Sequence, residues 1–372
     1  MKILFLLKKS KTYSSDYSSD YSSDYSENQE HNEPKDYSCG KLKSGLYNSA
    51  RLVSDFISTL PNMKSEVDLC IDGNNIDSKL HKFKPDICII EAVWITPKKL
   101  SELQKLYPKL KFVIRVHSKI PFLAMEGIAI TWIKEYLKIK NVEVSFNNEI
   151  THKDLNSIGI KNIYLPNIYE KIKIKKERCD FFKFFKFFNL RTKRKIKASY
   201  NIGCFGAIRP LKNQLNQAVA AIKFGEENNT IVNFFINYSR LEQSGENVYK
   251  NIKALFNNTN HNLIEIDWLN REDFLSLLSK MDISMQVSLT ETFNIVAADS
   301  VFVNVPVLVS KEINWISTGI SDPNNVDSMY IQMNKVLKNK EKYIRKNLIS
   351  LKNYNKKSTN TWIDFLYDNF EC

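Results

Sequence analysis

Short apolar runs alternate with helix-length segments along most of the 372-residue chain. In the first half these runs are nearly continuous in Val, Ile, Leu and Phe, which is typical of strands buried on both faces of a parallel sheet. An amphipathic pattern at residues 47–60 predicts a helix after the first run. The strands predicted in this series are residues 2–7, 67–71, 87–93, 112–117, 142–146 and 163–165.

The same alternation begins again near residue 201 and gives way to a mostly helical pattern from about residue 329. Two successive strand–helix series predict two doubly wound, Rossmann-like α/β domains. The strands predicted in the second series are residues 201–205, 231–236, 263–266, 283–287 and 305–309. We assign residues 1–168 to the first domain, 199–330 to the second and 331–372 to C-terminal helices.

Residues 10–38 interrupt the first series with a low-complexity insertion. Within it, the unit Tyr-Ser-Ser-Asp repeats over residues 13–26 and contains no aliphatic side chain. Such a segment cannot form a core, so we expect a disordered loop. A role in acceptor contact or phosphorylation is the alternative.

Residues 169–198 join the two domains and are rich in basic and aromatic side chains. Residues 171–197 hold twelve Lys and Arg against two acids, and so carry +10 of the chain's net charge of +13. One interpretation is a linker whose Phe side chains pack between the domains while its cations stay in water. It could also bind an anionic membrane surface, which would suit a lipid-linked acceptor, or a nucleic acid.

Composition narrows the class of protein. At 43% hydrophobic residues the chain can form substantial cores, and no apolar run approaches the roughly 20 residues of a membrane span. The six cysteines form no C-x-x-C pair, and we interpret them as reduced thiols. These features predict a cytoplasmic protein, either free or peripheral at a membrane surface.

Ligands of open parallel sheets bind at the carboxyl ends of the strands. The strand predicted at residues 201–205 ends near Gly206, and Arg209 and Lys212 precede a helix that begins near residue 213. A helix N-terminus with two cations would bind a diphosphate. A tight turn with two solvated cations explains the same residues. Gly45, before the first helix, either lets the backbone approach a ligand or forms a plain turn.

His117 ends the strand "KFVIRVH". At the carboxyl edge of a sheet, its imidazole could donate to a sugar hydroxyl or a developing charge. A lone histidine is more often structural. No second histidine or carboxylate stands at metal-ligand spacing from it, so we predict no metal site.

Two acids, Glu291 and Asp299, lie eight residues apart in "TETFNIVAADS". Glu291 follows a predicted strand, and a helix is expected from Phe293 with Thr292 as its cap. Asp299 would then lie roughly 9–12 Å further along the helix axis. Such acids could hold two ends of one hydroxyl-rich ligand, or they could be unrelated.

This stretch resembles the E-x7-E signature of retaining GT-B glycosyltransferases, particularly the family-4-like group. The resemblance implies that Glu291 binds the transferred sugar and that Asp299, where the family usually has Glu, binds the nucleotide ribose. It also implies that the backbone amides of residues 293–295 contact the donor phosphates. The implied donor-binding loop therefore consists of Glu291, Thr292, Phe293, Asn294 and Ile295.

Other stretches resemble the same family in the same order. "GAIRPLKN" is similar to its phosphate-binding loop, which implies that Gly206, Arg209 and Lys212 hold the diphosphate. "KSGLYNSA" is similar to the first-domain glycine loop, with Gly45. "VHSKIPF" resembles the strand-end histidine segment, with His117. "YLPNIY" resembles the family's "PNG" segment, with Ile168 in place of Gly.

The resemblance implies a GT-B enzyme with a cleft between its domains and C-terminal helices that cross back to the first domain. It implies sugar transfer with retention from a UDP- or GDP-sugar, with no further cofactor. The sequence contains no Asp-x-Asp pair, which favours metal-independent transfer. The acceptor could be a glycan, a lipid-linked sugar or hydroxymethylated DNA. A sugar-nucleotide 2-epimerase and an inactive nucleotide-sugar-binding protein are the alternatives.

Overall fold

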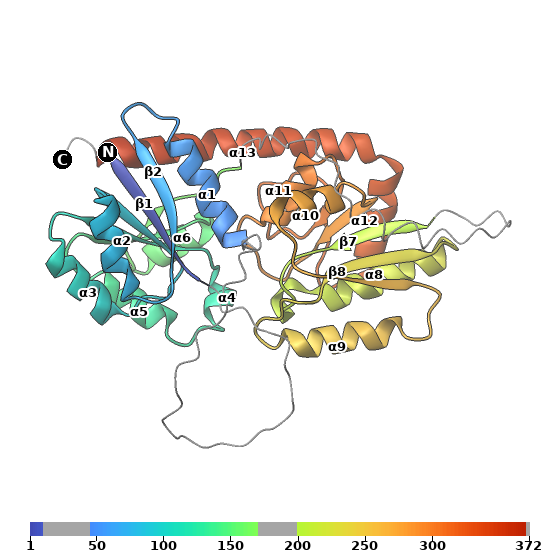
Figure 1. The fold of residues 1–372 in the computed structure, drawn as a ribbon. Helices are drawn as coiled ribbons and strands as arrows, with labels where there is room; N and C mark the ends of the chain where they lie inside the picture. Colours follow the sequence, from blue (N-terminus) through green and yellow to red (C-terminus); the bar gives the residue numbers. More distant parts are fainter. Residues whose placement is uncertain (10–44, 170–198, 370–372) are drawn as a thin grey trace, which may run out of the picture.

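The computed structural model describes residues 1–9, 45–169 and 199–369. The whole of the predicted insertion, and all of the basic–aromatic segment except Tyr169, therefore lie outside the described residues. The described chain forms two α/β units placed side by side, joined along one side by a long C-terminal helix (Figure 1).

The first unit, in the described part of the chain, is built on a parallel six-stranded sheet in the order β2-β1-β3-β4-β5-β6. Its strands are β1 (Lys2–Lys8), β2 (Lys64–Cys70), β3 (Ile87–Glu91), β4 (Lys111–Val116), β5 (Val142–Phe146) and β6 (Ile163–Tyr164). Its helices are α1 (Gly45–Ile57), α2 (Asn75–Phe83), α3 (Pro97–Leu106), α4 (Ile120–Leu123), α5 (Ala129–Tyr136) and α6 (Glu149–Ser157).

Both faces of this sheet are buried, as its unbroken apolar strands predict. Leu4 and Leu6 of β1 join a cluster that contains buried residues of α2, α3 and α5. Ile3, Phe5 and Leu7 point to the other face, where they pack with α1 and the C-terminal helix. The alternation of side chains along one strand thus supplies two cores.

The second unit, within the described residues, holds a parallel five-stranded sheet in the order β11-β10-β7-β8-β9. Its strands are β7 (Tyr200–Cys204), β8 (Val232–Asn237), β9 (Asn262–Ile266), β10 (Ile283–Gln286) and β11 (Val307–Val309). The 3-10 turn η2 (Pro210–Lys212) and the helices α8 (Gln214–Glu227), α9 (Gly245–Phe256), α10 (Arg271–Leu278), α11 (Ile295–Phe302) and α12 (Val326–Lys338) connect them. The predicted fold class, two doubly wound α/β domains, is confirmed.

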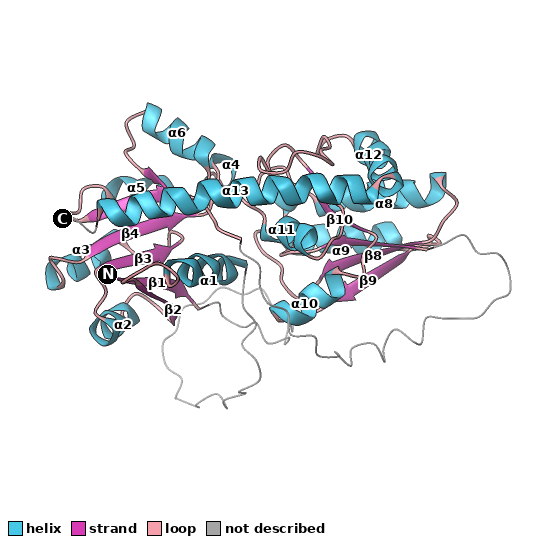
Figure 2. Cartoon of the chain, turned by 90° about the horizontal axis from the view of Figure 1, so that it is seen from above, coloured by secondary structure: helices cyan, strands magenta, loops and turns pink. Residues whose placement is uncertain are grey.

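The helix α13 (Lys340–Asp368) runs along both units (Figure 2). Its 29 residues span about 43 Å. Leu351 packs into a cluster formed mostly by residues of the second unit, whereas Trp362 and Leu366 pack into the core of the first. The indole N–H of Trp362 also donates to the backbone oxygen of Pro166 at 2.8 Å. The C-terminal helix therefore crosses back to the first domain, as expected.

Three of the cysteines, Cys70, Cys88 and Cys204, are buried free thiols, as predicted. In the part of the chain that is described, no helix combines the length and the apolar character needed to cross a membrane.

Candidate active site

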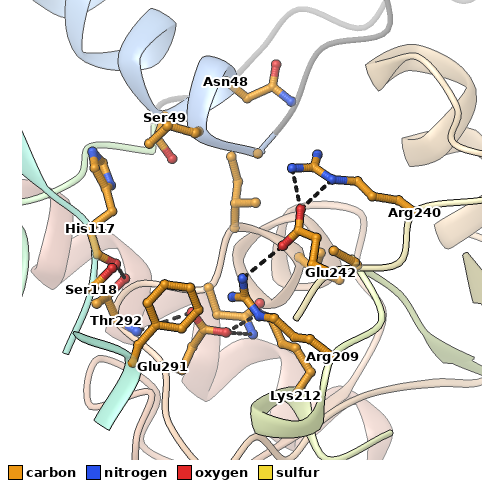
Figure 3. A pocket seen from close by; sticks show the side chains of 18 of the residues that line it. Asn48, Ser49, His117, Ser118, Arg209, Lys212, Arg240, Glu242, Glu291 and Thr292 are labelled. Atoms are coloured by element: carbon orange, nitrogen blue, oxygen red, sulfur yellow. Dashed lines mark hydrogen bonds and ion pairs between the residues drawn. The ribbon is translucent and has the colours of Figure 1, made fainter. Parts of the chain in front are cut away.

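A cavity of about 360 Å³ lies between the two domains, and residues of both line it (Figure 3). The lining comes from the carboxyl ends of strands in both sheets: Ala92 follows β3, His117 follows β4, Gly206 follows β7, Asn237 ends β8 and Glu291 follows β10. Two parallel sheets therefore direct their ligand-binding edges into one cleft. All the predicted site residues except Phe293 line this cavity: Gly45, His117, Gly206, Arg209, Lys212, Glu291, Thr292, Asn294, Ile295 and Asp299.

Lys212 and Glu291 are in direct contact on the second-domain wall of the cavity (Figure 3). The ammonium group of Lys212 donates to one carboxylate oxygen of Glu291, which also accepts from Asn294 Nδ2 at 3.1 Å. The backbone N–H of Thr292 donates to the other oxygen at 3.2 Å. The contacts hold the carboxylate at the cavity wall with the side chain only 10% exposed.

The electrostatics of Glu291 favour the ionised carboxylate. Burial raises the pKa of this side chain, but the nearby Lys212 and Arg209 charges and the hydrogen bonds outweigh burial. The pKa of Glu291 consequently lies below that of an ordinary glutamate. At neutral pH the cavity wall therefore presents a carboxylate beside an ammonium group.

Arg209 extends across the cleft from the second domain. Its guanidinium lies 4.7 Å from the ring centre of Phe122, which belongs to α4 of the first domain. It also pairs with Glu242 at 3.1 Å, and Glu242 binds Arg240 at 2.7 Å. A ligand with phosphate groups would thus meet two arginines that share one carboxylate.

The helix after Glu291 begins later than predicted. We expected Thr292 to cap a helix starting at Phe293, but α11 begins at Ile295 and the side chain of Asn294 accepts from the N–H of Ala297 at 2.9 Å. Asn294 has a φ of 57°, which asparagine tolerates better than threonine. The cap prediction was therefore wrong by two residues.

The first residues of α11 and of α1 lie against each other at the cleft. A side chain added to Gly45 would place its Cβ only 3.2 Å from the Ile295 Cγ2 atom. Gly45 thus allows two helix N-termini to approach one another. Phe293 does not line the cavity, because its ring packs into an aromatic cluster with Trp315 and Tyr354, whose ring centres lie 5.5 and 5.1 Å from its own.

Gly206 adopts a φ of +114°, and its N–H donates to Asn237 Oδ1 at 2.9 Å. Side chains rarely tolerate this backbone conformation, although the space around the glycine is open. The strand-to-loop turn before Arg209 therefore depends on glycine.

His117 is held by partners at both ring nitrogens. Its Nε2 contacts the carboxylate of Glu91, and Asn147 Nδ2 donates to its Nδ1 at 3.0 Å. Burial lowers the pKa of His117, and the Glu91 charge only partly offsets this shift. An imidazole in this arrangement is neutral and carries its proton on Nε2. Its donation to a ligand remains a prediction, which would require exchange of the Glu91 contact.

Behind His117 lies a fully buried ion pair that the sequence analysis missed. Arg115 binds Glu91 at 3.0 Å, and both side chains are 0% exposed. The guanidinium also donates to the backbone oxygen of Leu165 at 3.0 Å and to Asn167 Oδ1 at 2.6 Å. A signal was present, because Glu91 is a lone acid at the end of the apolar run "ICIIE" and Arg115 interrupts the run "KFVIRVH".

Thr292 connects the two walls of the cleft. Its hydroxyl donates to the backbone oxygen of His117 at 3.4 Å and accepts from Asn147 at 3.3 Å. A second link joins Lys119 of the first domain to Glu312 of the second at 2.8 Å. The loop that carries Glu291 is thus attached directly to the strand-end histidine segment.

Asp299 is the fifth residue of α11, about one turn from its start, and is 1% exposed. Arg271 contacts both of its carboxylate oxygens, at 2.6 and 3.3 Å, and the Tyr169 hydroxyl donates to one of them at 2.6 Å. Burial raises the pKa of Asp299, and these partners only partly reverse the shift. The predicted ribose ligand is therefore already engaged by two side chains that the sequence analysis did not identify.

No protein-family model matches the sequence, and no curated protein matches it. Solved structures do match the fold. A structure titled as trehalose-6-phosphate from E. coli bound with UDP-2-fluoro glucose superposes with a TM-score of 0.61 at 14% identity, covering 80% of this chain and 76% of that one. A UDP-forming trehalose-phosphate synthase from Burkholderia xenovorans gives 0.57 at 11% identity, with 80% and 78% covered.

A third structure, the N-terminal domain of a Candida albicans trehalose-6-phosphate phosphatase, gives a TM-score of 0.58 at 14% identity over 86% of each chain. These similarities confirm the GT-B architecture that the motifs predicted. Because one of these proteins is titled a phosphatase, the fold does not by itself assign the reaction.

Proposed function

We propose that this protein is a glycosyltransferase that moves a sugar from a nucleotide-sugar to an acceptor hydroxyl with retention of configuration. The observation that carries the proposal is the contact between Lys212 and Glu291 in the cleft between two doubly wound domains. A cation for the departing phosphate and an acid for the transferred sugar are thus adjacent, as that reaction requires.

The positive charges of the site suit a departing diphosphate. Arg209, Lys212 and the start of α11 all face the cavity from the second domain. Guanidinium and ammonium groups, together with free helix N–H groups, stabilise the negative charge that develops as the bond to the sugar breaks. We propose that they do so without a metal ion.

Glu291 is assigned to the sugar. As an ionised carboxylate it accepts hydrogen bonds from sugar hydroxyls and stabilises positive charge near the reacting carbon. We do not assign it the role of nucleophile. The acceptor hydroxyl attacks the sugar carbon on the face that the diphosphate leaves, and its proton passes to an oxygen of the departing diphosphate.

The donor proposed is a UDP-sugar. This choice follows the two similar structures whose titles name UDP, one UDP-forming and one bound to UDP-2-fluoro glucose. A GDP-sugar is the alternative.

A sugar hydroxyl is the acceptor that the first-domain wall fits best. Asn48, Ser49 and Ser118 line it (Figure 3), as does Asn167, and their hydroxyl and amide groups suit neutral polyols. A lipid-linked sugar or hydroxymethylated DNA would need further contacts, and residues 171–197, which were predicted to provide them, lie outside the described residues.

The proposal is tested by nucleoside diphosphate release from UDP-, GDP- and ADP-sugars, with glycans, lipid extract and hydroxymethylated DNA as acceptors. We expect one donor to react and Glu291→Gln to lose at least about 100-fold in rate. Glu246→Gln, on an exposed glutamate of α9, is the matched control. Conversion of UDP-N-acetylglucosamine without an acceptor would indicate an epimerase, and nucleotide binding without turnover would indicate a binding protein.

A further inference from the structure

The wall of the cavity formed by α10 and α11 carries a cluster of three polar side chains, Arg271, Asp299 and Tyr169. Arg271 begins α10, Asp299 lies in α11, and Tyr169 follows the last strand of the first domain. The two helices lie next to each other in the second domain (Figure 1). Both Arg271 and Asp299 line the cavity.

Asp299 is poorly placed to accept a hydrogen bond from a ligand. Its Oδ1 atom already accepts from Tyr169 and from Arg271, each at 2.6 Å, and its Oδ2 atom accepts from Arg271 at 3.3 Å. Each carboxylate oxygen has about two lone-pair sites, so Oδ1 is saturated. The side chain is 2% exposed, and an aspartate reaches one methylene less far than a glutamate.

Arg271 is the more accessible partner of the pair, with its side chain 16% exposed. Its two terminal nitrogens hold Asp299, and one of them also donates to the Tyr169 hydroxyl at 3.2 Å. Its Nε atom is buried and has no hydrogen-bond partner among the described residues, so a ligand would not reach it without a shift of the side chain. A guanidinium has five N–H donors, and three of them bind Asp299 and Tyr169, so besides Nε one N–H of Nη1 is left to donate to a ligand.

The position of Arg271 is set before a ligand arrives. Its guanidinium lies 5.7 Å from the ring centre of Tyr169, and the backbone N–H of Tyr169 donates to Asn355 Oδ1 of α13 at 2.9 Å. The ring of Tyr169 packs 6.4 Å from that of Phe293. An arginine held by a carboxylate and an aromatic ring loses little side-chain freedom on binding.

We propose that Arg271, rather than Asp299, contacts the ribose hydroxyls of the donor nucleotide. The inference rests on the proposed function and concerns its nucleotide subsite. A hydroxyl oxygen there accepts from the guanidinium, whereas a carboxylate would accept from the hydroxyl. Asp299 and Tyr169 are positioning residues, which hold the guanidinium at the wall.

The test is a calorimetric titration of UDP, GDP and ADP, followed by the 2′,3′-dideoxy analogue of whichever binds most tightly. Wild type is expected to bind the analogue on the order of tenfold more weakly, the effect of losing a hydrogen bond to a charged group. Arg271→Gln is expected to bind the nucleoside diphosphate and its dideoxy analogue with equal affinity. Asp299→Asn is expected to keep the discrimination, because an asparagine oxygen still accepts from Arg271.

Two further variants distinguish the loss of a ribose contact from misfolding. Arg271→Lys keeps a cation beside Asp299 but lacks the planar fork, and it too is expected to lose most of the discrimination. Lys250→Gln, on an exposed lysine of α9, is the control. Thermal melting of each variant reports whether it is folded.

The proposal is overturned if Arg271→Gln and Arg271→Lys keep the discrimination, if Asp299→Asn loses it, or if wild type shows none. Failure of every nucleoside diphosphate to bind would instead reject the proposed function, and this inference with it. Binding of a nucleotide without an effect of Arg271 rejects this inference alone.

Discussion

The ammonium group of Lys212 lies against the carboxylate of Glu291, although the two residues are 79 positions apart in the sequence. One follows β7 through the turn η2, and the other follows β10, the strand next to β7 in the sheet. Neighbouring parallel strands thus bring both charges to the same edge. This contact links the phosphate and sugar roles assigned to the site.

Removal of the Lys212 charge is expected to raise the pKa of Glu291. Its pKa is now below the ordinary value, so the carboxylate is ionised and active above this pKa, and activity falls as pH drops through it. In Lys212→Met the acidic limb of the kcat/KM profile should move to higher pH, and kcat should fall by roughly 10²-fold. Lys250→Met is the matched control. An unchanged acidic limb would show that Lys212 does not set the ionisation of Glu291.

The buried Arg115–Glu91 pair should be costly to break. Arg115→Met leaves Glu91 buried without its cation, which is expected to cost about 3–5 kcal/mol in the free energy of unfolding. The free energy of unfolding of the double variant Glu91→Leu/Arg115→Leu should be much closer to that of wild type, because neither charge is left buried alone. Urea unfolding at pH 7 measures both.

The same pair gives stability a pH dependence. Burial raises the pKa of Glu91, but the Arg115 charge and the hydrogen bonds from Arg115 and His117 outweigh burial and hold this pKa below its ordinary value. The contribution of the pair is therefore present above the pKa of an unfolded glutamate and is lost as pH falls through the lower folded value. A wild type and an Arg115→Met protein that lose stability in parallel on acidification would contradict this account.

Thr292→Val should weaken the attachment of the Glu291 loop to the first domain. The variant loses hydrogen bonds to His117 and Asn147, so kcat/KM should fall about 3–10-fold with the stability of each domain preserved. Steady-state kinetics with the reactive donor measure the effect. Thr131→Val, at an exposed position of α5, should leave the kinetics unchanged.

Gly206→Ala tests the turn before the phosphate-binding residues. An alanine must adopt a φ of +114°, which is expected to cost about 1–3 kcal/mol in unfolding free energy or to shift the loop. Affinity for the nucleoside diphosphate should fall accordingly. Gly127→Ala is a close control, because its Cβ also meets open space and its φ is not positive. If Gly206→Ala and Gly127→Ala have the same unfolding free energy and the same nucleoside diphosphate affinity, the turn does not require glycine at position 206.

The strands and the two-domain fold could be predicted because they depend on the local pattern of apolar and polar residues along the chain. Residues 142–146 were predicted as a strand and form β5, and the other strand boundaries differ by a few residues. Apolar runs flanked by helical patterns leave little choice of fold class.

The partners of the site residues could not be predicted in the same way. Arg271 and Asp299 are 28 residues apart, and Tyr169 lies 130 residues from Asp299. No periodic pattern connects such positions, since tertiary packing alone brings them together. The start of α11 at residue 295 was missed for a different reason. Thr292 was the expected cap, but the helix is capped by Asn294, whose backbone has a positive φ that the sequence pattern does not reveal.

The most direct test of the account is a crystal structure with an unreactive 2-fluoro-sugar donor, carrying the nucleotide that binds most tightly in solution. We predict diphosphate oxygens within about 3 Å of the charged groups of Lys212 and Arg209, with a hydroxyl of the sugar on Glu291. A donor bound outside the cleft, or one whose diphosphate lies away from Lys212, would contradict the account.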